Sequence, residues 1–384
     1  MKLSAVSYSE HSRDPREWKL NKLVLGDINL LVGKNATGKT RSLNIISALS
    51  NLLSGHRRGL DQAHWNTEFV DDNYRFHYRL KIKSKEVVSE QLLRFKGERK
   101  KVLLERGRGG SGKLWAEKSK ARMDFESPTD QIVAVARQDR IQHSYFIPLV
   151  DWGKGTFYFH FGRVSGHTLA LMVDDSTQKS GFDPKDTSKV IEVFRRGEEE
   201  FGEDFTCDVI SDMQRIGYSV EEIGIAPPTD LTVSGPLILG KIINLYLKEK
   251  DLRCNTEQMS ISDGMFAALS IIIQINYLIR SKILKCLLID DIGEGLDYER
   301  SCELIDLLIE KAKTHSVQLV MTSNDRFVMN RVPLEMWTVL NRTGFTVKGY
   351  NIHNSAKKFE RFRFTGMSNF DLFATDYLFA DAGK

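Results

Sequence analysis

The chain has 384 residues, of which 41% are hydrophobic and 28% are charged, and this is enough apolar material for a sizeable core. The formal net charge of +4 is too small to indicate nucleic-acid binding by itself. Four cysteines without C-x-x-C spacing, an N-terminus without an apolar signal region and the absence of a long apolar run favour a cytoplasmic protein that does not enter a membrane.

The first expected elements are strands over residues 2–8 and 18–32. They lead into a segment that fits G-x-x-x-x-G-K-[ST] at every fixed position. This segment consists of Gly33, Lys34, Asn35, Ala36, Thr37, Gly38, Lys39 and Thr40. Apolar residues then recur at helical spacing between Leu43 and Leu53, so the motif stands between a strand and a helix, as a phosphate-binding loop requires.

The residues of this loop have assignable roles. Gly33 and Gly38 allow the backbone to wrap closely around an anion, and the start of the helix adds partial positive charge. Lys39 is expected to reach the β- and γ-phosphates, and the Thr40 hydroxyl is expected to ligate Mg²⁺. The loop therefore predicts a site for ATP and Mg²⁺.

Further along the chain, residues 74–106 show the alternation expected of antiparallel β-structure. The glycine-rich residues 107–112 are typical of a flexible loop. Between Arg94 and Arg122, eleven Lys or Arg residues stand against three Glu. Such a segment can grip nucleic-acid phosphates, dock an acidic partner or be a solvated surface, and the sequence leaves all three open.

Helices are expected near residues 187–200 and 205–216. A third, strongly apolar helix begins at the turn Ser262-Asp263-Gly264. Ser262 suits the N-cap position of this helix, and a helix N-terminus also attracts an anion.

Two later segments carry polar side chains at the ends of apolar patterns. Asp290 ends the apolar run that begins at Cys286, where its carboxylate can hold Mg²⁺ opposite Thr40. The tail over residues 357–364 alternates basic and aromatic residues, which favours a half-buried strand over a platform on which bases stack.

The order of these motifs, followed by Gly295-Leu296-Asp297, resembles the ABC-type ATPase head shared by SMC proteins, RecF-like repair proteins and OLD-like bacterial ATPases. It is most similar to the compact prokaryotic AAA-family ATPases related to OLD proteins, many of which belong to phage-defence systems. The segments that carry this closer resemblance are residues 262–265, 290–297, 318–325 and 359–366.

The resemblance implies an α/β fold: a P-loop NTPase of the ABC/SMC-head type with an antiparallel β subdomain and a helical signature lobe. The implied divisions are an N-terminal ATPase lobe over residues 1–165, a helical lobe over 166–258, a lobe with the signature helix and Walker B strand over 259–350, and a C-terminal segment of the same head over 351–384.

The resemblance also implies a homodimer. Two chains would enclose two ATP molecules, each bound by Lys39 and Thr40 of one chain and by Ser262 and Gly264 of the other. Such a dimer would hydrolyse ATP and control a separate effector protein in bacterial antiviral defence. The alternative is a RecF-like DNA-binding repair or recombination ATPase, with residues 94–122 as the DNA contact.

The chain differs from the usual pattern of ABC-type heads at the positions of the catalytic glutamate and the switch histidine, and the position of the glutamine is open. Asp291 stands where a glutamate normally activates the attacking water, and Glu294 is a nearby substitute. Asn324 stands where a switch histidine is expected, and an amide can bond a γ-phosphate but cannot relay a proton. Hydrolysis is therefore expected to be slow. The glutamine that senses Mg²⁺ in such heads has two candidates, Gln138 and Gln142.

Overall fold

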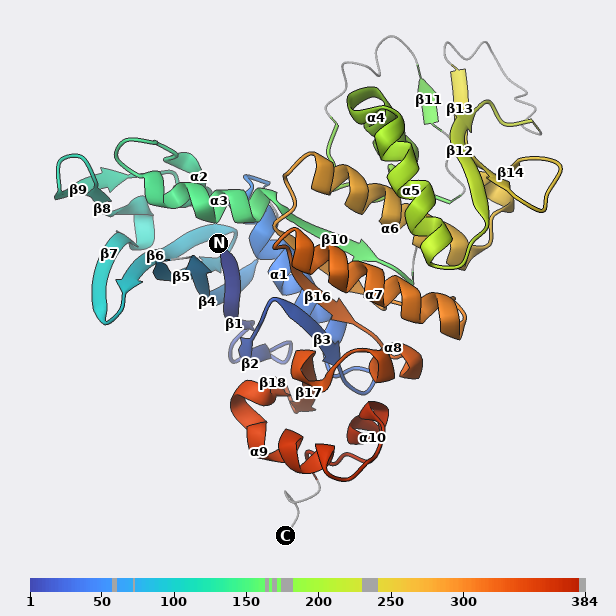
Figure 1. Cartoon of the computed structure of the whole chain (residues 1–384). Coiled ribbons are helices and arrows are strands. Elements are labelled where there is room, and N and C mark those ends of the chain that lie inside the picture. The colour runs from blue at the N-terminus through green and yellow to red at the C-terminus, as the bar shows by residue number, and fades with distance from the viewer. Residues whose placement is uncertain are drawn as a thin grey trace.

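The structure is a computed structural model that describes residues 1–56, 61–71, 73–162, 166–167, 171–173, 182–229 and 241–379. Figure 1 shows a β-rich subdomain on one side of a central sheet, a helical lobe on the other, and a group of helices near the C-terminus below. None of the helices in the described part of the chain has both the length and the hydrophobicity of a membrane span.

The central part of the main sheet is parallel. Its strands, in spatial order, are β10 (Thr156–His160), β15 (Cys286–Asp290), β16 (Gln318–Thr322), β3 (Ile28–Val32) and β17 (Trp337–Thr343). Every residue of β3, β15 and β16 is buried, as expected for strands covered on both faces. The carboxyl ends of these strands share one edge of the sheet, which is where α/β proteins place their ligands.

The same 14-stranded sheet continues into the β-rich subdomain. The further strands, in spatial order, are β18 (Thr346–Asn351), β2 (Trp18–Val24), β1 (Lys2–Glu10), β4 (Gln62–Asp71), β5 (Tyr74–Lys83), β6 (Glu86–Lys96), β7 (Arg99–Arg106), β8 (Ser111–Ala116) and β9 (Ala121–Glu126). From β2 to β9 each neighbouring pair is antiparallel, so the β-structure expected over residues 74–106 is confirmed. Burial alternates along β4 and β5, which leaves one face of this part in solvent.

The helices follow the expected spacing of apolar residues. They are α1 (Lys39–Leu53), α2 (Val133–Ala136), α3 (Ile147–Lys154), α4 (Val190–Phe201), α5 (Glu203–Arg215), α6 (Asp263–Arg280), α7 (Tyr298–Thr314), α8 (Arg326–Arg331), α9 (Ile352–Arg363) and α10 (Asn369–Ala374). The helices expected near 187–200 and 205–216 correspond to α4 and α5.

A smaller sheet belongs to the helical lobe (Figure 1). It contains β11 (Leu171–Val173), β13 (Lys241–Glu249) and β12 (Val220–Ala226), with β14 (Thr256–Glu257) paired to β13. Short 3₁₀ turns cover Arg108–Gly110, Ser144–Phe146, Gln258–Ser260 and Leu334–Met336.

The helix α1 packs between the two halves of the main sheet. Its residues Leu43, Ile46 and Leu49 are buried in one hydrophobic core, which also contains Leu31 of β3 and Trp65 of β4. The opposite face of the parallel strands packs in a second core against α4, α5, α6 and α7. The sheet is therefore covered on both faces where it carries the phosphate-binding loop.

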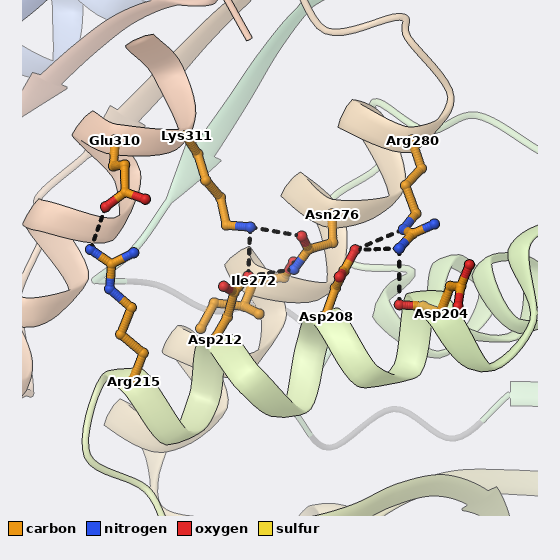
Figure 2. Close-up of polar contacts among 9 residues, drawn as sticks. All are labelled: Asp204, Asp208, Asp212, Arg215, Ile272, Asn276, Arg280, Glu310 and Lys311. Carbon is orange, nitrogen blue, oxygen red and sulfur yellow. Dashed lines mark hydrogen bonds and ion pairs between the residues drawn. The ribbon is translucent and has the colours of Figure 1, made fainter. Parts of the chain in front are cut away.

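Polar contacts hold α6 against its neighbours (Figure 2). The ammonium of Lys311 on α7 lies 2.8 Å from Asp212 Oδ2 on α5 and donates to Asn276 Oδ1 on α6 at 2.9 Å. Asn276 Nδ2 in turn donates to Asp212 Oδ2 at 2.7 Å. Arg280 of α6 pairs with Asp208 of α5 at 2.7 Å. Because Asp212 and Asn276 are buried, separating these three helices would leave polar groups without partners.

The tail over residues 357–364 is part of the helix α9, so the strand expected there is wrong. Phe359 and Phe362 are buried, and their spacing of three residues places both on one face of a helix. The two residues between them, Glu360 and Arg361, are exposed. Basic and aromatic residues alternate in the sequence, which suggested the two-residue period of a strand. The buried residues instead follow the period of a helix.

The flexible loop expected over residues 107–112 is also wrong, because the segment is a tight turn bonded at both ends. Gly107 N–H donates to Ser111 O at 3.1 Å, and Ser127 N–H donates to Gly110 O at 3.1 Å. A Cβ at Gly110 would lie 2.1 Å from the Ser127 carbonyl oxygen, so this position requires glycine. The partner that orders the turn, Ser127, lies outside the segment.

Candidate functional site

The loop over Gly33–Thr40 connects β3 to α1, as the motif predicts. Gly38 has φ of 102° at the N-cap of α1, a conformation that favours glycine. Ala36 also has positive φ, 63°. Thr37 closes the turn, since its N–H and Oγ1 both donate to the Lys34 carbonyl at 3.2 and 2.8 Å. The backbone thus curves around the entrance to α1, where a helix N-terminus attracts anions.

Lys39 points back into this loop. Its Nζ donates to the Gly33 carbonyl oxygen at 2.7 Å, and its side chain is buried. Burial lowers the pKa of Lys39, and the nearby carboxylates of Asp291 and Asp290 oppose that shift. The ammonium is held inside the loop and hydrogen-bonds a neutral carbonyl, and a phosphate oxygen would give it a charged partner.

Asp290, at the end of β15, is the buried centre of a polar cluster that opens to solvent. Its Oδ1 accepts from Thr322 Oγ1 at 2.6 Å and from Thr40 Oγ1 at 3.2 Å. Its Oδ2 lies 3.5 Å from the Tyr158 hydroxyl and 3.6 Å from His160 Nδ1. Asp290 itself is 3% exposed. Three neighbouring parallel strands and the start of α1 therefore meet at one carboxylate.

The donors around Asp290 fit Mg²⁺ in the way the loop motif predicts. A hydroxyl oxygen and a carboxylate oxygen are ligands that Mg²⁺ prefers, and the ion normally completes its shell with water and phosphate oxygens. In the described part of the chain no three His, Cys, Asp or Glu side chains gather to hold a metal by themselves. Thr40 and Asp290 would thus hold the ion together with a bound nucleotide.

Asp291 follows with a positive φ of 53°, which turns its side chain away from the strand. Its N–H donates to Thr322 Oγ1 at 2.9 Å. The pKa of Asp291 is raised by burial and then by the carboxylates of Asp290 and Glu294, against the opposing effect of Lys39. A carboxylate with a raised pKa is better suited to accept a proton.

A cavity of about 410 Å³ lies over the loop. It is lined by Trp18, Asn35, Ala36, Gly38, Lys39, Thr40, Arg41, Asp291, Asn324 and Arg342. The structure therefore brings Asn324, which follows β16 in sequence, to the same space as Lys39 and Asp291. Glu294 does not line this cavity. Its carboxylate lies against Gly162, where an added Cβ would be 1.9 Å from Glu294 Oε2.

Three lining residues were missed in the sequence. Arg342 of β17 donates to the Ala36 carbonyl of the loop at 3.3 Å. The ring of Trp18, on β2, packs against the loop at Gly38, where an added Cβ would lie 3.1 Å from it. The Arg41 guanidinium stacks on Trp18 at 4.6 Å from the ring centroid. These contacts join segments far apart in sequence, so local spacing carries no signal for them.

His160 and Tyr158 were also missed as site residues. The parallel register pairs His160 of β10 with Asp290 of β15. A signal was present, because His160 is a polar residue near the end of an apolar strand, the same pattern that marked Asp290. Gln138 and Gln142, the two candidates for the glutamine that senses Mg²⁺, do not line the cavity. Gln138 donates to the Val135 carbonyl, and Gln142 accepts from Lys118 N–H.

The turn at Ser262 forms the N-terminus of α6. Ser262 Oγ accepts from Met265 N–H at 3.4 Å, so Ser262 is the N-cap. Gly264 packs on the next loop, because an added Cβ would lie 2.3 Å from the Gly295 carbonyl oxygen. Ser262 is exposed, and neither residue lines the cavity of its own chain.

No protein-family model matches the sequence, and no curated protein matches it. Solved structures similar to the chain include SMC head domains. One, an Smc head bound to the C-terminal winged-helix domain of ScpA, has 10% identity and a TM-score of 0.49, over 91% of this chain and 98% of that chain.

A Smc head from Pyrococcus furiosus, bound to the C-terminal domain of ScpA, has 10% identity and a TM-score of 0.47, over 94% of this chain and 99% of that chain. The SMC head domain from Thermotoga maritima has 10% identity and a TM-score of 0.46, over 91% and 99%. Likeness at this identity concerns the fold alone, so the chemistry below is derived from the residues of this chain.

Proposed function

We propose that the chain binds ATP with Mg²⁺ over the Gly33–Thr40 loop and hydrolyses the ATP. One observation carries the proposal: the fold brings Lys39, Thr40, Asp290 and Asp291, from two separate segments, to a single cluster with a cavity above it. A charged ammonium, a hydroxyl and two carboxylates at a helix N-terminus match the requirements of a triphosphate with its metal ion.

Each residue has a role in that chemistry. Thr40 and Asp290 would hold Mg²⁺, which supplies neutralisation of the charge on the β- and γ-phosphates. Lys39 would bond phosphate oxygens in place of the Gly33 carbonyl. Asp291 would orient the attacking water and accept its proton. Asn324, which also lines the cavity, would donate its amide N–H to the γ-phosphate.

Two features favour a low rate. Aspartate at position 291 is one methylene shorter than the usual glutamate, so it approaches a water over the γ-phosphate less easily. Asn324 cannot exchange a proton with the site, because an amide does not titrate near neutral pH. ATP would therefore stay bound for long enough to act as a signal.

The second half of the proposal is a homodimer that closes around ATP. Ser262 and Gly264 do not line the cavity of their own chain, and the helix N-terminus that they form faces solvent. Two large apolar side chains lie close in sequence to Ser262 and to the Gly295 loop on which Gly264 packs. They are Met259, which is 57% exposed, and Tyr298, which is 56% exposed. A second copy would cover them and would present Ser262 to the opposing phosphate.

Light scattering tests this closure. With a non-hydrolysable ATP analogue the mass is expected to rise to two copies, and Ser262→Arg is expected to keep it at one, because the added bulk blocks the opposing phosphate. Ser262→Ala loses the N-cap, about 1 kcal/mol of stability, together with the hydroxyl offered to the opposing phosphate, but adds no bulk, so it separates loss of the cap from blockage. Ser111→Arg, on the exposed β8 surface, controls for added charge. A mass that changes neither with nucleotide nor with Ser262→Arg would contradict the proposal.

The closed dimer is proposed to control a separate effector protein in the bacterial cytoplasm, in antiviral defence. This part rests on the resemblance to OLD-related ATPases, and purification of the chain with the products of neighbouring genes tests it. The alternative, a RecF-like repair ATPase, would need DNA to stimulate turnover.

A further inference from the structure

The strand β5 carries a basic residue at every outward position. Burial alternates along the strand, so every second side chain points away from the core. These outward residues, here named the β5 row, are Arg75, His77, Arg79, Lys81 and Lys83. Successive outward positions on a strand are about 6.6–6.8 Å apart, so the row is about 27 Å long. Figure 1 shows β5 within the β-rich subdomain, and its neighbours in the sheet are β4 and β6.

The neighbouring strands do little to neutralise the centre of this row. Arg79 stands opposite Asn66 and Gln91, and its guanidinium donates to both amide oxygens at 3.3 Å. Lys81 stands opposite His64 on β4 and a serine on β6. Directly opposed basic residues destabilise a sheet. In keeping with this, burial lowers the pKa of His64, and Lys81 and Arg79 lower it further.

Two acidic residues on the neighbouring strands stand opposite members of the β5 row. Glu68 is opposite His77, but its carboxylate is paired with Lys22 of β2 at 2.5 Å. Glu86 is opposite Lys83 at the end of the row. The positive charge of the middle of the row is therefore uncompensated by the sheet itself.

Some cations elsewhere in the described part of the chain are held in ion pairs. Figure 2 shows Arg215, Arg280 and Lys311 each facing a carboxylate. In the basic segment over residues 94–122, four of the eleven cations are in ion pairs: Arg94 with Glu117, Lys113 with Asp124, Arg122 with Glu105, and the buried Arg106 with Glu90. Other cations of that segment also stand outside ion pairs, and the β5 row differs from them in forming an unbroken line along one strand.

An aromatic ring adjoins one end of the row. The Phe95 ring of β6 lies 5.8 Å from the Arg75 guanidinium and 4.6 Å from the His77 ring, measured between centroids. Within β4, β5 and β6, all of which the structure describes, Val70 is the large apolar side chain with substantial exposure, at 42%. A surface that inserts into lipid needs more exposed apolar area than this.

We propose that the β5 row binds the phosphodiester backbone of a nucleic acid. Double-stranded DNA carries one negative charge per ~1.7 Å of helix axis, so a row about 27 Å long faces several phosphates of one duplex. Cations on the exposed face of a sheet contact the backbone and not base edges, so binding is independent of sequence. None of these residues belongs to the nucleotide site, and the proposal stands independently of ATP hydrolysis.

Fluorescence anisotropy with labelled double-stranded DNA, single-stranded DNA and RNA tests this surface between about 50 and 200 mM salt. The wild-type chain is expected to bind at least one of these polymers with an affinity that falls steeply with salt. The triple variant Arg75→Glu, Arg79→Glu, Lys81→Glu is expected to bind at least ~10²-fold more weakly. Its slope of log affinity against log salt is expected to fall by about 2–3, for three lost phosphate contacts.

A matched variant carries the same change of charge elsewhere: Lys313→Glu, Lys357→Glu and Arg361→Glu, on exposed positions of α7 and α9. It is expected to keep most of the binding. If the glutamate variant fails to fold, as judged by thermal unfolding, the glutamine triple at the same positions replaces it. Equal binding by wild type and row variant, equal losses in both triples, or binding by the wild type to phosphatidylserine vesicles alone would overturn the proposal.

Discussion

Lys39→Ala is expected to reduce ATP turnover by at least ~10²–10³-fold and to weaken ATP binding, because the Lys39 ammonium is the positive charge held against the Gly33 carbonyl inside the loop. The Lys39 ammonium donates a hydrogen bond to the Gly33 carbonyl, and its side chain does not belong to the hydrophobic core. The fold is therefore expected to survive the substitution. Equilibrium binding of labelled ATP, phosphate release and a thermal unfolding curve measure the three quantities separately.

Lys34→Ala provides the matched control. Lys34 lies in the same loop, but its Nζ pairs at 2.5 Å with Asp376 near the C-terminus, and both side chains are largely exposed. A surface pair of this kind contributes little to stability, so this variant is expected to bind and hydrolyse ATP almost as the wild type does. Unchanged turnover in Lys39→Ala, or equal losses in the two variants, would contradict the assignment of the loop.

Asp291→Asn is expected to lower turnover by about 10²-fold or more while ATP stays bound, in line with the loss of a general base. The change is nearly isosteric, and Asp291 lines the cavity beside Lys39. Phosphate release under single-turnover conditions, with ATP affinity measured in parallel, separates the chemical step from binding.

Glu294→Gln is the comparison that decides between the two carboxylates. Glu294 acts on Asp291 electrostatically but does not line the cavity, so its substitution is expected to cost less. A collapse of turnover in Glu294→Gln together with survival in Asp291→Asn would reverse the two roles. Full turnover in both variants would mean that neither carboxylate is the group that activates the attacking water.

The parts of the site that were predictable from the sequence are those encoded by local spacing. The loop from Gly33 to Thr40 is a fixed pattern between a strand and a helix, and Asp290 marks the end of an apolar run. Ser262 has the residue type and position of an N-cap. Each of these depends on neighbours within a few residues, so the physical constraint is visible in the sequence itself.

The parts that were missed depend on how distant strands align. His160 reaches Asp290 only because β10 and β15 pair in a particular register, and Arg342 reaches the loop through β17. The tail was misjudged because the two buried phenylalanines, Phe359 and Phe362, are spaced by three residues among basic ones. Sequence alternation alone does not say which residues are buried.

Mixing two inactive variants tests the composite site most directly. Lys39→Ala damages the loop of its own chain, whereas Ser262→Arg damages only the site of its partner. A dimer of one chain of each kind therefore contains one site with an intact Lys39 and an intact Ser262. Because about half of the dimers in an equal mixture are mixed, about a quarter of the sites would be whole.

Phosphate release is therefore expected to be near background for each variant alone and to recover when the two are mixed. The double variant Lys39→Ala, Ser262→Arg, mixed with either single variant, is expected to give no recovery, because no pairing then joins an intact Lys39 to an intact Ser262. Recovery that follows this pattern is the result that an ATP site shared between two chains predicts. Full activity in Ser262→Arg alone, or no recovery at any mixing ratio, would contradict it.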